Sequence, residues 1–269
     1  MNAQRQAICS PMAFKRIAHA VAWLALAVIG AWIFAADSGG DAHAYWAARG
    51  YGAVADERDA FLYTPAFLQA LWPLQQLPWE VFRFLWLAAG LVTLGWLTGP
   101  VIAVLVLLPG PYSPVFTDLF FGNIMVFTGA VTVAGFRWPS VWAALPFAKL
   151  VPGVLLAWPL LKGQLRPLLI VVAVTALSLL TASGLWWDWL ATLQESIERP
   201  PVGGLAGWLI PRTITAAGFV ILGAWRGWRW TLPVAVLLTQ PILWFSSFTI
   251  LLGWVWLLRN RDANKASEP

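Results

Sequence analysis

The chain has few of the residues that most metal-binding and catalytic motifs require. It contains one cysteine, Cys9, and two histidines, His19 and His43, among 269 residues. One cysteine cannot form an intrachain disulfide, and two isolated histidines cannot make a metal site by themselves. The sequence also lacks a Gly-rich phosphate loop, an HExxH helix and a nucleophile elbow. We therefore predict no cofactor, and leave open whether a divalent cation contributes.

Charged residues are scarce as well, at 11% of the chain, whereas hydrophobic residues make up 60% and the mean hydropathy is +0.71. Such a chain cannot cover its surface with polar groups, so its solvent must be lipid. The alternating pattern of a membrane β-barrel is missing, and the backbone must then satisfy its hydrogen bonds within helices. The sequence predicts an all-α, polytopic membrane helix bundle.

The net charge of +5 and the pI near 9.8 could suggest a nucleic-acid partner. The basic residues are instead scattered over the ends of apolar segments and form no groove-sized patch. Positive charge on cytoplasmic loops produces the same overall balance. We therefore predict membrane lipids, and no nucleic acid, as partners.

The long apolar segments define one membrane domain. The first, 17–36, has 20 residues, which exceeds the ~7–15 of a signal-peptide core and suits a bilayer core of ~30 Å. We interpret it as a retained transmembrane helix, with further spans at 79–97 and 167–183 and a Trp-rich interfacial helix at 186–199. The predicted organisation is a cytoplasmic tail at 1–16, a transmembrane domain at 17–258 with extracytoplasmic loops at 37–64 and 185–212, and a cytoplasmic tail at 259–269.

Several other apolar runs are too short to cross a bilayer. We expect short helices at 65–77, 100–108, 123–136, 139–148, 150–161, 213–225, 231–244 and 245–258, with a loop at 112–122. Runs of about 10–14 residues span only ~15–21 Å at ~1.5 Å per residue. Short helices are tolerated where they line a cavity walled by protein. The pattern predicts full-length and short or re-entrant helices around an extracytoplasmic cavity.

Charge predicts the orientation of this bundle. With the N-terminus inside and 139–161 as a re-entrant hairpin, eleven Lys and Arg residues fall on the cytoplasmic side and five on the outer side. Ten of the 12 acidic residues fall outside. This asymmetry favours cytoplasmic N- and C-termini.

Asp37 and Asp41 follow the first apolar segment directly, in GGDAHAYWAARGYG and the residues before it. A carboxylate beside a cavity wall can have its pKa raised toward the working range of a general base. The alternative is a solvated loop acid or a helix N-cap, because Asp41 precedes AHAYWAA. On a helix, Asp41 and Tyr45 would share a face, and His43 would point elsewhere.

Lys149 interrupts two apolar half-helices in FAKLVPG. An ammonium at mid-bilayer costs roughly 2.5–3.5 kcal/mol unless it is paired or hydrated, which makes such a lysine a functional candidate. The alternative is that its side chain reaches to the membrane interface.

Two further stretches could contribute polar groups. In FFGN, Asn123 could cap the helix that follows, or face a ligand. In FLYTPAF, Tyr63 could stack on a sugar or pack at the bilayer interface.

The order of these features resembles glycosyltransferase family 87, membrane mannosyltransferases of the GT-C superfamily that use polyprenyl-phosphate sugars. The resemblance runs from about residue 17 to 258. It is carried by DAHAYW, FLYTPAFLQALWPLQQLP, FFGNIMVFTGA, AALPFAKLVPGVLLAWPLLKGQLRP and LLTQPILWFSSF.

The resemblance implies a GT-C bundle with an extracytoplasmic active site, in a plasma membrane as in bacteria. By position, Asp41 would be the general base that activates an acceptor hydroxyl, on a lipid or glycan. Lys149, or less directly Arg212, would neutralise the departing polyprenyl phosphate, with inversion at the sugar carbon. The candidate substrate-binding residues are Lys149, Tyr45, Tyr63, Asn123, Arg212, Asp37 and His43.

The chain departs from the family in two ways. The late Pro-x-x-Trp stretch is commonly followed there by a His-Tyr pair, whereas Trp244 is followed here by Phe-Ser-Ser-Phe. The chain is also shorter than typical members. A non-catalytic relative therefore stays open as an alternative, as does a small lipid or solute transporter, although the related halves expected of a transporter are not evident.

Overall fold

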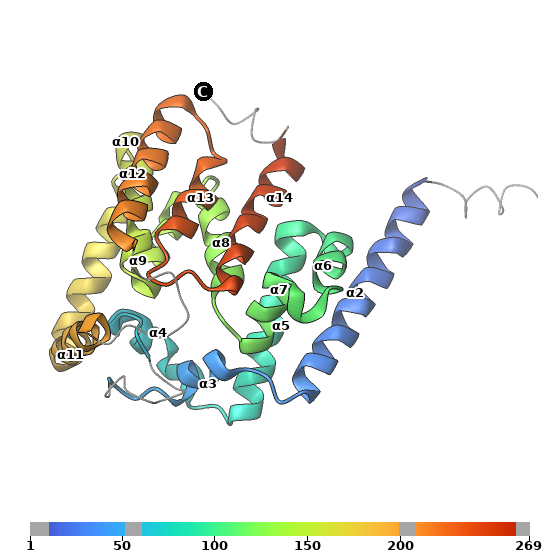
Figure 1. The fold of residues 1–269 in the computed structure, drawn as a ribbon, viewed down its shortest axis with the longest axis horizontal. Coiled ribbons are helices and arrows are strands. Elements are labelled where there is room, and N and C mark those ends of the chain that lie inside the picture. The colour runs from blue at the N-terminus through green and yellow to red at the C-terminus, as the bar shows by residue number, and fades with distance from the viewer. Residues whose placement is uncertain (1–10, 52–60, 199–207, 262–269) are drawn as a thin grey trace, which may run out of the picture.

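The computed structural model describes residues 11–51, 61–198 and 208–261 (Figure 1). Every regular element in these three ranges is a helix, which confirms the all-α prediction at that level. The elements are α2 (Pro11–Ala35), α3 (Gly40–Ala47), α4 (Pro65–Gln75), α5 (Trp79–Thr98), α6 (Pro100–Leu107), η1 (Gly110–Tyr112), α7 (Pro114–Phe121), α8 (Met125–Ala134), η2 (Pro139–Ala143), α9 (Ala144–Ala148), η3 (Val151–Leu156), α10 (Ala157–Leu161), α11 (Arg166–Glu198), α12 (Leu209–Arg226), α13 (Thr231–Leu238), η4 (Phe245–Leu251) and α14 (Leu252–Arg259).

Three of these helices are long and apolar enough to cross a membrane. They lie within α2, α5 and α11, and the bent pair α7–α8, whose axes differ by 110°, could form a fourth span. α2 and α11 lie on opposite sides of the bundle (Figure 1) and expose large apolar side chains such as Val28 and Leu180. Exposed apolar surface of this extent indicates association with a membrane.

The long α11 combines two segments that the sequence separates. Its backbone leaves helical geometry at Ala182, with φ −155° and ψ 56°, so that a kink divides the apolar stretch from the Trp-rich stretch. The prediction of two helical segments meeting near this point is confirmed. Arg199, where the second was expected to end, lies outside the described residues.

The prediction of a loop at 112–122 is wrong, because α7 occupies 114–121. Ser113 begins this helix, with its side-chain oxygen accepting a hydrogen bond from the backbone N–H of Phe116, and Pro114 takes the first helical position. Proline is favoured at that position because the N–H that it lacks would have no partner there anyway. A Ser-Pro pair thus marks a helix start here and not a turn.

The helix expected at 231–244 also ends early, since α13 stops at Leu238. Gln240 precedes Pro241, and the residue before a proline is pushed away from helical geometry. The shorter result leaves Gln240 in a non-helical segment between α13 and η4, where it has a role described below.

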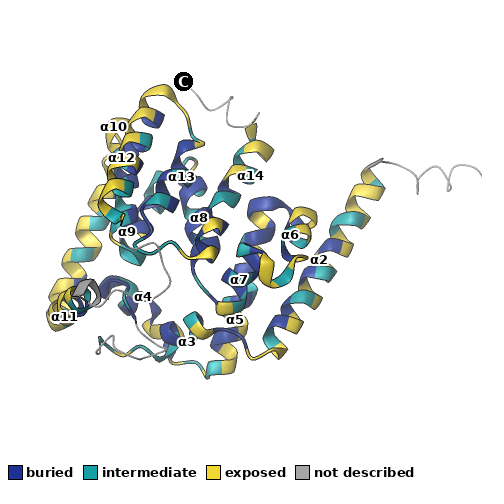
Figure 2. Ribbon diagram, in the orientation of Figure 1, coloured by how far each residue is buried: buried dark blue, intermediate teal, exposed yellow. Residues whose placement is uncertain are grey.

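Buried residues concentrate on the central helices, and α11 stays exposed along most of its length (Figure 2). One core cluster includes Tyr45, Phe82, Trp142 and Leu232, and it joins α3, α5, η2 and α13. The short helices therefore pack against one another in the interior, while the long ones α2 and α11 lie outside them. This packing holds the short α3 and the α9–η3 junction close to α7 and α8.

Candidate functional site

Asp41 lies in the first turn of α3, directly after a tight turn that follows α2. The turn uses left-handed backbone at Asp37 (φ 50°) and Gly39 (φ 105°), and the Gly39 N–H donates to the carbonyl of Phe120 at 2.8 Å. Gly39, not Asp41, is the N-cap of α3, and no side chain caps this helix. The interpretation of Asp41 as a helix cap is therefore wrong, and its carboxylate is available for other contacts.

The side chain of Asn123 contacts the Asp41 carboxylate. Its Oδ1 accepts a hydrogen bond from the Ile124 N–H at 2.7 Å, which orients the amide and leaves its nitrogen to donate to Asp41. The expected capping role of Asn123 is wrong in position, because the N-cap of α8 is Ile124. A polar side chain of the α7–α8 junction is thus directed at Asp41.

Asp118, which the sequence patterns did not single out, holds this junction together. It is fully buried, and its Oδ1 and Oδ2 accept hydrogen bonds from the Met125 and Val126 N–H groups at 3.1 and 2.8 Å. Its backbone carbonyl accepts from the Asn123 N–H at 2.8 Å. Asp118 therefore caps α8 from the preceding helix and fixes the bend that presents Asn123. The sequence feature that indicates this role is a single acidic residue in the otherwise mainly apolar segment PVFTDLFF.

We expect Asp118→Ala to lower the free energy of unfolding by roughly 2–4 kcal/mol, because it leaves two buried N–H groups without an acceptor. Thermal unfolding of the purified protein, followed by size-exclusion chromatography after heating, measures this loss. Thr117→Ala is the matched control, because that hydroxyl lies on the neighbouring position of α7 and accepts neither amide. Equal melting temperatures for the two variants would contradict the capping role.

Lys149 lies where α9 ends and η3 has not yet begun, in extended backbone with φ −141° and ψ 132°. This confirms that two half-length helical segments meet at Lys149. Its Nζ donates to Oε1 of Gln240 at 3.2 Å and lies 5.5 Å from the centre of the Tyr63 ring. Gln240 is buried and its own nitrogen donates to the Val236 carbonyl, so its oxygen is held toward Lys149. The ammonium is thereby directed into the protein.

Gln240 is a second residue that sequence reasoning missed. It belongs to the late LLTQPILWFSSF stretch, in which Phe245 and Ser246 follow Trp244. The amide of Gln240 is the polar group that this stretch brings to Lys149. The sequence shows that Gln240 precedes Pro241, but the direction of its side chain depends on where α13 ends.

Tyr45 and Tyr63 are a pair of buried aromatic residues next to the site. Their hydroxyl oxygens lie 2.8 Å apart in a hydrogen bond, and their rings pack edge to face with centres 5.2 Å apart. The hydroxyl of Thr64 donates to the carbonyl of Phe147, which ties the start of α4 to the segment ending at Lys149. Residues of three separate stretches are held together by these contacts.

The electrostatics follow from this arrangement. Burial raises the pKa of the Asp41 carboxyl above its usual range, while the positive charge of Lys149 and the hydrogen bond from Asn123 oppose that rise. Lys149 in turn interacts electrostatically with both Asp41 and Asp118. The site therefore combines a carboxylate able to take up a proton with an ammonium able to attract an anion.

Three predicted site residues lie apart from this cluster. The side chain of Asp37 is 96% exposed and pairs with Arg83, and the His43 ring packs against Trp46 and Trp79. Arg212 donates from Nη2 to the carbonyl of Pro241 at 3.1 Å. Arg212 thus contacts the residue next to Gln240.

Arg83, near the start of α5, clamps the turn that precedes Asp41. Its Nη1 donates to Asp37 Oδ1 at 3.0 Å and to the Ser38 carbonyl at 3.2 Å, and its Nη2 donates to the Phe34 carbonyl at 3.0 Å. The guanidinium is buried and lies 4.2 Å from the centre of the Phe34 ring. Arg83 therefore satisfies carbonyls at the end of α2 and sets the path of the chain into α3.

Arg83→Met should make backbone amides 36–41 exchange with deuterium about tenfold faster. The substitution removes hydrogen bonds from a charged donor, which stabilise the turn by about 1.4 kcal/mol. Hydrogen-exchange mass spectrometry of the intact protein measures this. Asp37→Asn should change these rates much less, since it keeps the two carbonyl contacts and asparagine tolerates the left-handed backbone. Unchanged exchange in Arg83→Met would show that the turn is held by other contacts.

Searches against protein families, curated proteins and solved structures found no match to this chain.

Proposed function

We propose that this protein is an integral membrane glycosyltransferase. It transfers a hexose, which we propose to be mannose, from a polyprenyl-phosphate donor to a hydroxyl of a lipid or glycan acceptor. The observation that carries the proposal is that Asp41, Asn123 and Lys149, from three separate stretches of the chain, lie in one partly exposed cluster. The motif order resembles that of glycosyltransferase family 87, which supports the same chemistry, and a GT-C type of bundle would account for the mixture of long and short helices.

In the proposed reaction, Asp41 accepts the proton of the acceptor hydroxyl. The hydroxyl oxygen forms a bond to the sugar C1 while the bond from C1 to the phosphate oxygen breaks on the opposite face, which inverts the configuration. The electron pair leaves with polyprenyl phosphate, and the Lys149 ammonium balances its charge. Asn123 holds the Asp41 carboxylate in place through its hydrogen bond. Tyr45 is 2% exposed and holds the Tyr63 hydroxyl, so Tyr63, beside the Lys149 ammonium, is the member of this pair proposed to contact the sugar.

The proposed orientation places this cluster on the extracytoplasmic side and both termini in the cytoplasm. α5 supports it, because its 20 residues extend ~30 Å and an arginine lies at each end, one from α5 itself and one from α14. Arg83 lies near its start with Asp37, and Arg259 donates to the carbonyls of Trp96 and Leu97 near its end. The two ends correspond to the acidic outer and basic inner sides that the charge distribution favours.

The test is a transfer assay in membranes that contain the overproduced protein, with polyprenyl-phosphate mannose labelled in the sugar. We expect label to appear in a lipid or glycan product, in the configuration opposite to that of the donor. Glucose and arabinose donors, supplied in parallel, identify the sugar. A folded protein that transfers none of the three to any membrane acceptor, and consumes no donor, would contradict the proposal.

A further inference from the structure

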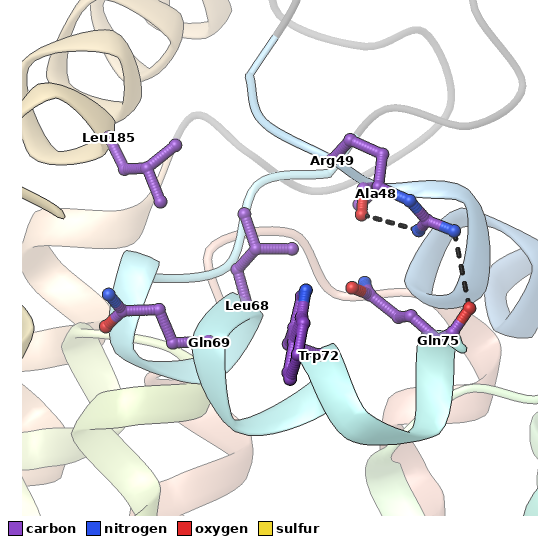
Figure 3. Close-up of a pocket in the computed structure, with 7 residues that line it drawn as sticks. All are labelled: Ala48, Arg49, Leu68, Gln69, Trp72, Gln75 and Leu185. Atoms are coloured by element: carbon purple, nitrogen blue, oxygen red, sulfur yellow. Dashed lines mark hydrogen bonds between the residues drawn. The ribbon is translucent and has the colours of Figure 1, made fainter. Parts of the chain in front are cut away.

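A concave site lies between the end of α3, α4 and α11 (Figure 3). It has a volume of about 370 Å³. The lining residues are Ala48, Arg49, Leu68, Gln69, Trp72, Gln75 and Leu185, and we call it the α4 groove. None of them belongs to the Asp41–Lys149 cluster.

The walls of the α4 groove are mainly apolar. Leu68 and Trp72 lie one helical turn apart on α4, and the Trp72 side chain is 61% exposed. Leu185 faces them from α11, three residues after the kink at Ala182 (Figure 3). Gln69 Nε2 donates to the Thr181 hydroxyl at 3.1 Å, which fixes the distance between α4 and α11. The groove is a preformed slot for an apolar chain.

One cation lies at its rim. Arg49 donates from Nη1 to the carbonyls of Trp46 and Ala48, at 2.7 and 3.1 Å, and from Nη2 to the Gln75 carbonyl at 3.3 Å. These partners are neutral, the described lining residues include no acid, and no carboxylate of the described residues forms an ion pair with Arg49. The guanidinium is therefore held in a fixed place by neutral acceptors, and its charge suits a phosphate.

The depth of the groove points to a lipid. α11 is one of the helices able to cross a membrane, and the residues just beyond Leu185 include Trp186, Trp187 and Trp189. Tryptophan is enriched at the level of the lipid headgroups. An apolar slot with an arginine at that level matches the two ends of a phospholipid.

We propose that the α4 groove binds an anionic membrane phospholipid, with the phosphate on Arg49 and an acyl chain along Leu68, Trp72 and Leu185. The occupant differs from the sugar donor of the proposed reaction, and the inference does not depend on that reaction. Gln75, which also lines the groove, donates from Nε2 to the Tyr45 carbonyl at 2.7 Å. This bond joins α4 to α3, the helix that contains Asp41.

Native mass spectrometry of the purified protein, titrated with phosphatidylglycerol or phosphatidylcholine of identical acyl chains, tests the headgroup. We expect phosphatidylglycerol to bind about fivefold more tightly, which corresponds to the electrostatic attraction of one arginine to an anionic lipid surface. Arg49→Gln should abolish the preference, whereas Arg226→Gln, which changes an exposed arginine of α12, should retain it. Equal affinities in the unaltered protein, or a preference that survives Arg49→Gln, would overturn the proposal.

Leu185→Gln tests the apolar wall separately, and it should weaken both lipids equally without changing their ratio. A diazirine-bearing phosphatidylglycerol should crosslink to peptides of α4 or α11; crosslinks confined to other helices would place the lipid elsewhere. Soluble glycerol phosphate should not compete, and competition by it would assign the site to a free phosphate ester. Asp41→Asn should bind lipid normally, so that failure of this proposal and failure of sugar transfer are distinguishable.

Discussion

Asp41→Asn should lower the rate of sugar transfer by about 10²–10⁴-fold, the usual contribution of a general base. Asparagine has the size of aspartate and can still accept a hydrogen bond from Asn123, but it cannot take up the proton of the acceptor hydroxyl. Transfer from polyprenyl-phosphate mannose by matched amounts of folded protein measures the effect. Donor binding should change far less than the rate.

Asp37→Asn is the matched control, because Asp37 lies in the same turn but its side chain is 96% exposed and faces Arg83. It should retain most of the activity. Loss of transfer in Asp37→Asn with full activity in Asp41→Asn would move the base to Asp37 and contradict the role proposed for Asp41.

The pH dependence gives a second measure of the same group. Because burial raises the pKa of Asp41, the rate should fall on acidification at a higher pH than an ordinary aspartate would give. The sign follows from the chemistry: the base acts only when deprotonated, so activity is present above its pKa and lost below. Removing the Lys149 charge takes away an effect that lowers this pKa, and should move the acidic limb to still higher pH.

Lys149→Met should lower kcat/KM for the lipid donor by about 10²–10³-fold, because the charge that develops on the leaving phosphate loses its counter-charge. Methionine keeps the length of the apolar part of the side chain and cannot donate to Gln240. Lys149→Arg should recover part of the loss, since it restores the charge at a different geometry. Initial rates over a series of donor concentrations separate these effects.

Lys162→Met provides the control, because Lys162 is exposed just after α10. Its donor kinetics should match those of the unaltered protein. If Lys149→Met also shows unaltered donor kinetics, the lysine has only a structural contact with Gln240 and takes no part in phosphate binding.

The elements that could be predicted from the sequence are those whose pattern is local. The expected span at 79–97 corresponds to α5, and the expected helix at 65–77 to α4, because a mainly apolar stretch begins at Pro65 in one case and directly after Pro78 in the other. The break at Lys149 was equally visible, since a charge between two short apolar runs is costly in lipid unless the chain gives it a polar partner. Asp41 and Asn123 were found individually, but their contact was not.

The residues that were missed depend on contacts between distant segments. Asp118 acts through the first amides of α8, and that role requires α7 to be a helix, which the Ser-Pro start concealed. Arg83 was included in a span although it binds carbonyls of the turn after α2. A polar residue in an apolar run signals that a partner exists, but the identity of the partner is set by the tertiary fold.

Donor consumption by the purified protein tests the proposed chemistry most directly. The protein is reconstituted in liposomes with polyprenyl-phosphate mannose and a membrane lipid extract as acceptor, and the release of polyprenyl phosphate is followed over time. We expect release that depends on Asp41 and on Lys149, with the mannose recovered in inverted linkage to the acceptor. Release that continues unchanged when both residues are replaced, or a donor that stays intact with the folded protein, would contradict it.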